Sequence, residues 1–326
     1  MSHIIWPILL LVVGFVLLVY GADFFVDGCC SIAKTLRIPS IIIGLTIVAL
    51  GTSAPEAAVS ITAALEGSSG ISAGNCVGSN FFNLLVIVGL CAVFAPVPVG
   101  PDIVKRDFPF SLFVEGLVLL VFCDFAFGKT SNVLGRVAGI TLFALYLVYL
   151  GFLIFSVRKN RQAAVEKDDD DKPMPVIKAI ILIVGGGAAV VFGGNIVVDN
   201  ASMIARFFGM SETLIGLTIV ALGTSLPELV TSFVAAKKGE VDLALGNCIG
   251  SNIANFLFVL GLSATVRPIV IGMDVLIDTV ILIAASAIVY VMCLTGRRLS
   301  RKEGVTMILM YAVYTAYIFM RNYNVF

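Results

Sequence analysis

Residues 44–90 read GLTIVALGTSAPEAAVSITAALEGSSGISAGNCVGSNFFNLLVIVGL, and residues 216–262 read GLTIVALGTSLPELVTSFVAAKKGEVDLALGNCIGSNIANFLFVLGL. The two stretches align without a gap at a constant offset of 172, and 26 of the 47 aligned positions are identical. Each copy carries a glutamate, several asparagines and several hydroxyl residues inside otherwise apolar sequence. Ionisable groups in such surroundings are costly unless they are paired or solvated, so their duplication indicates a function shared by two halves of the chain.

The whole chain has the composition of a helical membrane protein. It is 59% hydrophobic and 13% charged with a mean hydropathy of +1.07, whereas soluble domains are about 25% charged. Long apolar runs predict helices, because a backbone in lipid must satisfy its polar groups internally. We predict an all-α membrane protein with ten transmembrane helices, near residues 4–32, 39–65, 71–95, 107–124, 133–157, 176–206, 212–236, 242–264, 274–294 and 304–321.

A polar segment divides these helices into two sets of five. Residues 158–172 read RKNRQAAVEKDDDDK and are followed by two prolines, which predicts a solvated linker. We therefore expect a first five-helix repeat at 1–157, a cytoplasmic linker at 158–175 and a second repeat at 176–326. Because five is odd, the second repeat enters the membrane from the opposite side, so the two repeats have inverted topology.

The basic residues predict the orientation of the chain. If both termini lie outside the cell and the central loop is cytoplasmic, 16 of the 21 Lys and Arg residues lie on the cytoplasmic side, as the positive-inside rule requires. We interpret Trp6, Tyr146, Tyr149 and Tyr323 as aromatic anchors at the membrane surfaces. The expected location is thus a multi-pass position in the cell membrane, with the lipid bilayer as a partner.

The same composition argues against several other partners and chemistries. The formal net charge is zero and no basic patch favours nucleic acid. His3 is the only histidine, and the seven cysteines lack metal-ligand spacing. We therefore expect no cofactor and no enzymatic activity, and nothing in the sequence indicates an obligate protein partner.

The first polar element of each repeat is a broken helix. Residues 51–56 read GTSAPE and residues 223–228 read GTSLPE. The proline in each removes a helical N–H and clashes with the carbonyl four residues earlier, which predicts a kink and carbonyls turned into the protein near Ala49 and Ala221. Side-chain oxygens lie at the same level, on Thr52, Ser53, Glu56, Thr224, Ser225 and Glu228.

The second polar element is the next helix, which begins with GNCVGSNFFN in the first copy and GNCIGSNIAN in the second. Ser79 and Asn83 share one helical face, as do Ser251 and Asn255. Glycines four apart (Gly74 with Gly78, Gly246 with Gly250) predict close contact with the broken helix. Packing is an equally good interpretation for Asn75, Asn80, Asn247 and Asn252, and the sequence assigns no role to Glu115 or to the pair Asp27 and Asp199.

Together the two elements predict one cation site built from two halves. An intramembrane glutamate costs on the order of 3 kcal/mol or more unless it is compensated, and neither repeat carries a Lys or Arg near mid-span. Oxygen ligands without His or Cys indicate a hard cation, and flexible carbonyl, hydroxyl and amide oxygens suit Ca²⁺ better than Mg²⁺. Na⁺ has a similar radius, so competition between Ca²⁺ and Na⁺ at one site is physically natural.

The duplicated GTSxPE…GNxxGSNxxN pattern resembles the alpha repeats of the calcium/cation antiporter superfamily, and most closely those of its prokaryotic sodium/calcium exchanger branch. The resemblance implies ten helices, with helices 2 and 7 broken and helices 1 and 6 sliding during alternating access. It implies a Ca²⁺ position at Thr52, Glu56, Thr224 and Glu228. It also implies Na⁺ or shared positions that involve Ala49, Ser53, Ser79, Asn83, Ala221, Ser225, Ser251 and Asn255.

Within this implied set, the outer position uses Glu56, Ser79, Thr224, Ser225 and the Ala221 carbonyl. The inner position uses Glu228, Ser251, Thr52, Ser53 and the Ala49 carbonyl, and the middle one uses both glutamates with Asn83 and Asn255. Asn255 departs from many relatives, which have Asp there. Ser53 and Ser225 stand where the proton-coupled branch has Asn, which favours sodium coupling.

The function that follows is secondary active exchange of Ca²⁺ for Na⁺ by alternating access. The nearest alternative is an antiporter of the same fold that couples divalent cation transport to H⁺ or K⁺. An intramembrane hydrolase using the two glutamates would need a nucleophile or metal-bound water that the sequence does not supply. A channel is disfavoured because broken helices in inverted halves are typical of transporters.

Overall fold

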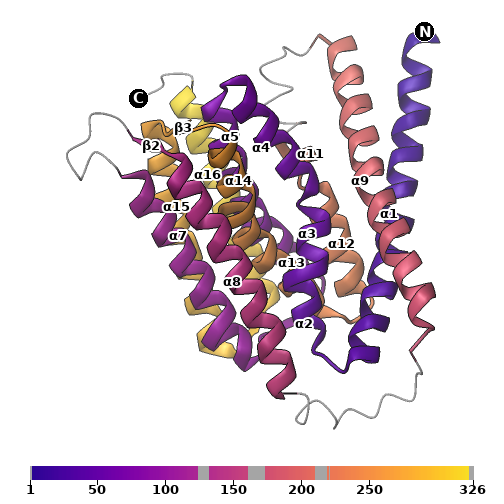
Figure 1. Cartoon of the computed structure of the whole chain (residues 1–326). Coiled ribbons are helices and arrows are strands. Elements are labelled where there is room, and N and C mark those ends of the chain that lie inside the picture. Colours follow the sequence, from indigo (N-terminus) through magenta and orange to yellow (C-terminus); the bar gives the residue numbers. More distant parts are fainter. Residues whose placement is uncertain (1, 124–131, 161–172, 210–218, 220, 323–326) are drawn as a thin grey trace.

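The computed structural model describes residues 2–123, 132–160, 173–209, 219 and 221–322, almost all of them in helices (Figure 1). The first half contains α1 (Ser2–Leu36), α2 (Ser40–Ile43), α3 (Ala49–Thr52), α4 (Ala54–Glu66), α5 (Ser69–Phe81), α6 (Val88–Phe94), α7 (Phe108–Phe122) and α8 (Arg136–Asn160). The second contains α9 (Val176–Phe207), α11 (Ala221–Gly223), α12 (Leu226–Lys237), α13 (Val241–Ala254), α14 (Leu260–Val266), α15 (Met273–Gly296) and α16 (Arg301–Asn322). Four π-helical segments continue these helices, namely η1 (Gly44–Val48), η2 (Phe82–Ile87), η3 (Ile103–Asp107) and η7 (Asn255–Val259).

In the described part of the chain, seven helices are long and apolar enough to cross a membrane, or eight if one bent pair counts as a single span. The protein is thus a multi-pass membrane protein. The predicted span at 107–124 corresponds to α7, which is continuous with η3 over Ile103–Phe122 but is not among these seven helices. The predicted span at 212–236 lies partly outside the described residues, so the number of ten spans stays a prediction.

The bent pair lies at the predicted break of the first repeat. Ser40–Thr52 and Ala54–Glu66 meet at an angle of 48°. Ser53 joins them with φ −79° and ψ 9°, outside the regular helical range, and Pro55 occupies the first turn of α4. A proline is favourable there because its missing N–H has no helical partner to lose. In the second repeat, Ser225 and Pro227 hold the same places before and within α12.

Two short antiparallel ribbons, which the all-helical prediction lacks, join the halves. β1 (Val97–Pro98) pairs with β4 (Arg298–Leu299), and β2 (Val133–Leu134) pairs with β3 (Ile269–Val270). Each ribbon therefore takes one strand from each half of the chain. Strands of two residues carry no periodic signal, which is why the sequence did not predict them.

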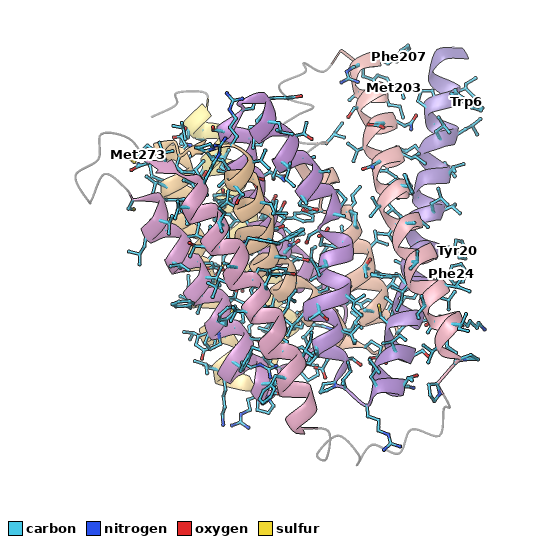
Figure 2. The ribbon with its side chains drawn as sticks, in the orientation of Figure 1. Trp6, Tyr20, Phe24, Met203, Phe207 and Met273 are labelled. Carbon is cyan, nitrogen blue, oxygen red and sulfur yellow. The ribbon has the colours of Figure 1, made fainter. Side chains whose placement is uncertain are left out.

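α1 and α9 form a long pair along one side of the bundle (Figure 1). Their backbones come close at glycines, since a Cβ on Gly21 would lie 3.0 Å from the Gly186 carbonyl oxygen and one on Gly186 would lie 2.7 Å from that of Gly21. Trp6, Tyr20 and Phe24 point outward from α1 (Figure 2). An apolar outer face of this kind is what contact with lipid requires.

Two of the predicted aromatic anchors are wrong. Tyr146 and Tyr149 of α8 are buried, with Tyr146 against Phe258 and Tyr149 stacked on Phe110. Their rings fill the core between helices, where a tyrosine contributes apolar area. Trp6 is exposed, as an anchor at the membrane surface would be, whereas Tyr323 lies outside the described residues.

α1 also contacts the end of α12 through a charged cluster. Lys238 Nζ lies 2.8 Å from Asp23 Oδ1 and 2.6 Å from Asp27 Oδ1. Partial burial disfavours the lysine's charge, but the hydrogen bonds to the two aspartates outweigh it and the pKa of Lys238 is raised. α9 makes no comparable contact with α4 in the described part of the chain, so the two long helices do not dock alike.

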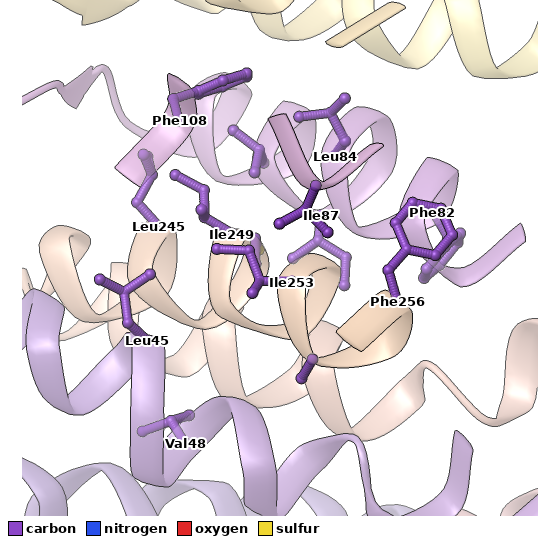
Figure 3. Packing of buried hydrophobic residues seen from close by; sticks show 14 of the residues in the cluster. Leu45, Val48, Phe82, Leu84, Ile87, Phe108, Leu245, Ile249, Ile253 and Phe256 are labelled. Carbon is purple, nitrogen blue, oxygen red and sulfur yellow. The ribbon is translucent and has the colours of Figure 1, made fainter. Parts of the chain in front are cut away.

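The core centres on α13, which is almost wholly buried. Its Leu245, Ile249 and Ile253 lie among apolar side chains of η1, η2 and α7 (Figure 3). Gly246 permits the close crossing, because a Cβ there would lie 2.5 Å from the Ile41 carbonyl oxygen. No described atom lies within 4 Å of a Cβ on Gly74 or Gly78, and the segment equivalent to Ile41–Leu45 falls at 213–217, outside the described residues.

Candidate cation-binding site

The two predicted glutamates lie at the centre of the bundle, and each is bonded by a serine from the other half of the chain. Ser225 Oγ donates to Glu56 Oε1 at 3.1 Å, and Ser53 Oγ donates to Glu228 Oε1 at 3.1 Å. All four side chains are fully buried. The two broken segments therefore face each other, and the exchange of partners brings both carboxylates into one site.

No cationic side chain in the described part of the chain neutralises either carboxylate. Glu56 and Glu228 form no ion pair with a described lysine or arginine. The second oxygen of each, Oε2, has no hydrogen-bond partner among the described residues. Two buried carboxylates in apolar surroundings repel each other and need compensation by protons or by a bound cation.

Other predicted ligand residues also have unsatisfied oxygens. Among the described residues, seven of the predicted ligand residues have a buried side-chain oxygen without a hydrogen-bond partner: Glu56, Ser79, Asn83, Thr224, Glu228, Ser251 and Asn255. Buried polar atoms in native proteins are nearly always satisfied, so a cluster of exceptions calls for an explanation. Carboxylate, hydroxyl and amide oxygens together are the ligands that hard cations such as Ca²⁺ prefer.

The two threonines of the predicted Ca²⁺ position differ in their bonding. Thr52 Oγ1 lies 3.1 Å from Asn247 Oδ1 and 3.1 Å from the Val48 carbonyl oxygen. Thr224 Oγ1 is buried without a described partner. The sequence repeat equates the two positions, but the hydrogen-bond partners of the two hydroxyl groups among the described residues differ.

The expected free carbonyl at Ala49 is not found in that form. The Ser53 N–H donates to the Ala49 carbonyl oxygen at 3.0 Å, because the helix continues to Thr52 before it bends. Thr52 Oγ1 also lies 3.4 Å from the Ala49 carbonyl oxygen, so both acceptor positions of this carbonyl have a described neighbour. Pro55 has no N–H to donate to Gly51, so it is the Gly51 carbonyl that loses its helical bond, as the position of the proline predicts. Ala221 begins α11, directly after residues outside the description.

The asparagines with no assigned role tie the neighbouring helices to the backbone of the glutamates. Asn75 Nδ2 donates to Ser60 Oγ at 2.9 Å and to the Glu56 carbonyl oxygen at 3.3 Å. Asn247 Nδ2 donates to Ser232 Oγ at 2.8 Å, with the Glu228 carbonyl oxygen at 3.5 Å. These contacts fix α5 against α4 and α13 against α12.

A second asparagine cluster joins α5 to α13 directly. Asn80 Nδ2 donates to the Asn252 carbonyl oxygen at 3.2 Å, and Asn252 Nδ2 donates to that of Asn80 at 3.3 Å. Asn255 Nδ2 donates to Asn80 Oδ1 at 3.0 Å, which leaves Asn255 Oδ1 without a described partner. Asn83 lies within η2, and Asn255 begins η7. π-helical turns often occur at functional sites, where they change the direction of a side chain.

One further buried hydroxyl was missed in the sequence. Thr231 Oγ1 is buried on α12 without a described partner. It follows Glu228 by three residues, so both lie on one helical face. The repeat could not reveal it, because the equivalent residue of the first copy is Val59. Its spacing from Glu228 was the available signal.

These features define a class of protein: a polytopic helical membrane protein whose bundle buries two carboxylates together with several unpartnered side-chain oxygens. The chain belongs to the sodium/calcium exchanger protein family, whose model matches residues 6–155 and 178–320. The putative antiporter CaxA of Alkalimonas amylolytica is 39% identical over 94% of this chain and 97% of its own length. The sodium/calcium exchanger MaX1 of Methanosarcina acetivorans is 36% identical over 95% of this chain and 98% of its own length.

Solved structures agree with the family. The structure of the sodium-calcium exchanger NCX_Mj soaked with 2.5 mM Na⁺ and 10 mM Sr²⁺ matches with a TM-score of 0.82 and 30% identity, over 96% of this chain and 99% of that chain. The form soaked with 10 mM Na⁺ and no Ca²⁺ matches with a TM-score of 0.83 over 96% of this chain and 99% of that chain. Family, relatives and fold together support cation antiport involving Ca²⁺.

Proposed function

We propose that the protein is a secondary active antiporter that exchanges Ca²⁺ for Na⁺ by alternating access at the buried oxygen site. The observation that carries the proposal is the reciprocal bonding of Glu56 and Glu228 by serines of opposite halves. It creates a compact site of charge −2 that one Ca²⁺ neutralises, with hydroxyl and amide oxygens around it. The same oxygens suit Na⁺ ions one at a time, so the two cations compete.

The proposed ion positions follow the way in which the oxygens are grouped. Glu56 lies with Ser225, and Glu228 lies with Ser53, which supports two Na⁺ positions on opposite sides of a central Ca²⁺ position. In the proposal, Ser79 and Ala221 complete the first, and Ser251 and Ala49 complete the second. The central position takes both glutamates with Thr52 and Thr224, and a middle position takes them with Asn83 and Asn255.

Two features support sodium as the coupling ion and alternation as the mechanism. Sodium coupling is favoured by relatives named as sodium/calcium exchangers and by Ser53 and Ser225 at the site. Alternation is favoured by the unequal docking of α1 and α9, because α1 packs on α12 while α9 has no comparable contact with α4 in the described residues. A movement that exchanged these two arrangements would open the site first to one side and then to the other.

The proposed topology follows the distribution of basic residues. The halves at 1–157 and 176–326 are inverted repeats, both termini lie outside the cell, and the linker at 158–175 is cytoplasmic. Lys238 and its two aspartates then lie on the cytoplasmic side. Exchange of several Na⁺ for one Ca²⁺ would move net charge, so transport would respond to the membrane potential.

The test is uptake of radiolabelled Ca²⁺ into proteoliposomes loaded with Na⁺ and diluted into Na⁺-free buffer. The variants are Glu56→Gln and Glu228→Gln, which keep the side-chain shape and the oxygen that accepts from serine but remove one negative charge. Glu303→Gln is the matched control, because Glu303 bonds Ser300 at the start of α16, away from the site, and Gln serves the same capping role.

Uptake that requires internal Na⁺, persists in the control and disappears in both site variants supports the proposal. Uptake driven equally by a proton or K⁺ gradient without Na⁺ would instead make the protein an H⁺- or K⁺-coupled antiporter. Conduction of Ca²⁺ without any counter-ion would refute antiport altogether.

A further inference from the structure

Outside the central site, the structure buries a third carboxyl group in the membrane-spanning bundle. Glu115 lies on α7 and is 1% exposed. Ser286 Oγ of α15 donates to its Oε1 at 2.9 Å, and its Oε2 has no partner among the described residues. The hydrogen bond from Ser286 does not involve a residue of the central site, so the burial of Glu115 needs an explanation of its own.

Glu115 lines a small cavity between α7, α13 and α15. The cavity has a volume of about 10 Å³, which is close to the smallest space that holds one water molecule. Ser111, Ser286 and Asn252 supply the other polar groups of its wall, and the remaining lining is apolar or cysteine. The Asn252 Oδ1 atom also lacks a described partner.

No charged group in the described part of the chain compensates Glu115. The cavity wall carries only Cys248 and Cys293 as further titratable residues. The other titratable groups on the elements packed against Glu115 are engaged elsewhere or lie away from the cavity. Arg106 and Asp107 pair with each other, Asp274 and Asp278 lie beside Arg321, and Tyr290 donates to the Val104 carbonyl oxygen. Lys105 and Arg298 are exposed, and Asp242 lies in the first turn of α13. A carboxylate isolated in this way must be neutralised by whatever the cavity admits.

The cavity suits a proton better than a metal ion. A hard metal cation requires several oxygen ligands around it, up to six to eight for Ca²⁺. Here one carboxyl, two hydroxyls and one amide line a space of water size whose wall is mostly apolar. A proton needs only an acceptor for the hydrogen bond of the resulting acid, and Asn252, whose Oδ1 has no described partner, also lines the cavity.

We propose that Glu115 is a proton-binding site separate from the exchange site, and that Asn252 links the two. In the protonated form, the Glu115 hydroxyl donates towards Asn252 Oδ1, directly or through one water. Asn252 already donates to the Asn80 carbonyl oxygen at the centre of the bundle. The bound proton thus holds α7 and α15 against α13. Loss of the proton leaves an unpaired negative charge on Glu115 beside α13, the helix that carries Ser251 and is followed directly by Asn255 of the exchange site.

The site is tested by infrared spectroscopy of the full-length protein in lipid, with saturating Ca²⁺, at neutral pH. The difference spectrum between the unmodified protein and Glu115→Gln should contain the C=O band of a protonated carboxylic acid, which shifts in D₂O. The matched difference for Glu303→Gln should contain no such band. A carboxylate band in place of the acid band, or a band that moves with Na⁺ concentration, would overturn the proposal.

Ser286→Ala is the second variant, in case Glu115→Gln does not fold. It keeps the acid but removes the hydrogen bond to its Oε1, so the acid band of Glu115 should shift to higher frequency. An unchanged spectrum would overturn the assignment. This readout does not depend on which ions the central site exchanges, so it can fail or succeed independently of the proposed function.

The link through Asn252 is tested by transport, and this arm rests on the proposed function. Alkaline buffer should lower the uptake rate of the unmodified protein, because Glu115 loses its proton. Glu115→Gln mimics the protonated acid, so its rate should match the unmodified rate at neutral pH and fall less at alkaline pH. An equal alkaline loss in both proteins would overturn the link.

Discussion

Thr52 and Thr224 occupy equivalent positions in the sequence repeat, yet the structure predicts that their hydroxyl groups contribute differently to stability. The perturbation is Thr→Val at each position, which replaces the hydroxyl by a methyl group of similar size. At Thr52 this removes the bond, 3.1 Å long, to Asn247 Oδ1 and leaves that buried oxygen unsatisfied. An unsatisfied buried group costs about 1–3 kcal/mol.

At Thr224 the same change removes a hydroxyl that has no described partner, so its effect on the ion-free protein should be close to neutral or stabilising. For a chain of this size, a loss of 1–3 kcal/mol lowers the unfolding temperature by about 2–4 °C. Both variants lose one proposed Ca²⁺ ligand, so both should show weaker stabilisation by added Ca²⁺.

The assay is thermal unfolding of the purified protein in detergent, first without Ca²⁺ or Na⁺ and then across a Ca²⁺ titration. Thr52→Val should unfold at lower temperature than the unmodified protein in the ion-free buffer, whereas Thr224→Val should not. If Thr224→Val is destabilised as much as Thr52→Val in that buffer, the asymmetry assigned to the two threonines is wrong.

Three further predictions concern contacts outside the threonine pair. Lys238→Ala removes the ion pairs to the two aspartates of α1, and exposed ion pairs contribute about 0.2–1 kcal/mol each. The distribution of distances between spin labels on α1 and α12 should therefore broaden towards longer values, and an unchanged distribution would show that Lys238 does not hold the two helices together. Asn255→Asp places a titratable group at the proposed site and removes the hydrogen bond to Asn80, so Na⁺-dependent Ca²⁺ uptake should become sensitive to acid. A pH profile of uptake equal to that of the unmodified protein would count against a role for position 255 in ion binding. Gly246→Ala should lower the unfolding temperature, because its Cβ would lie 2.5 Å from a backbone oxygen. Gly116→Ala has no described atom within 4 Å of its Cβ, so it should be neutral or stabilising by about 0.5–1 kcal/mol. Equal effects of the two variants would show that the close helix crossing at Gly246 is not rigid.

Candidate site residues could be selected from the sequence because polar residues in apolar helices are conspicuous. The duplicated glutamates and the i, i+4 spacing of Ser79 and Asn83 indicated oxygen groups directed to a common place. The structure brings Glu56, Ser225, Glu228 and Ser53 together there. That these residues bind ions stays a prediction, for which the transport and stability measurements are the tests.

The sequence could not show contacts between segments that share no sequence motif. Thr52 and Thr224 lie in identical local sequence, so only the tertiary structure distinguishes their partners. Glu115 and Ser286 have no counterparts in the repeat, and the pairing of α7 with α15 was not predictable from spacing. Tyr146 was interpreted as a surface anchor because a tyrosine in an apolar run fits both a membrane interface and a helical core.

The exchange of serine partners between the halves also affects how the chain is made. Glu56 is synthesised well before Ser225, which lies 169 residues later in the chain. At a synthesis rate of about 5–20 residues per second, the first half waits roughly 10–30 s for this partner. During that interval a glutamate destined for complete burial has neither its hydrogen-bond donor nor the second carboxylate with which it would hold a cation. Biogenesis must therefore keep the first broken helix hydrated or protonated until the second one arrives, and the assembled centre of the bundle is among the last parts of the protein to form.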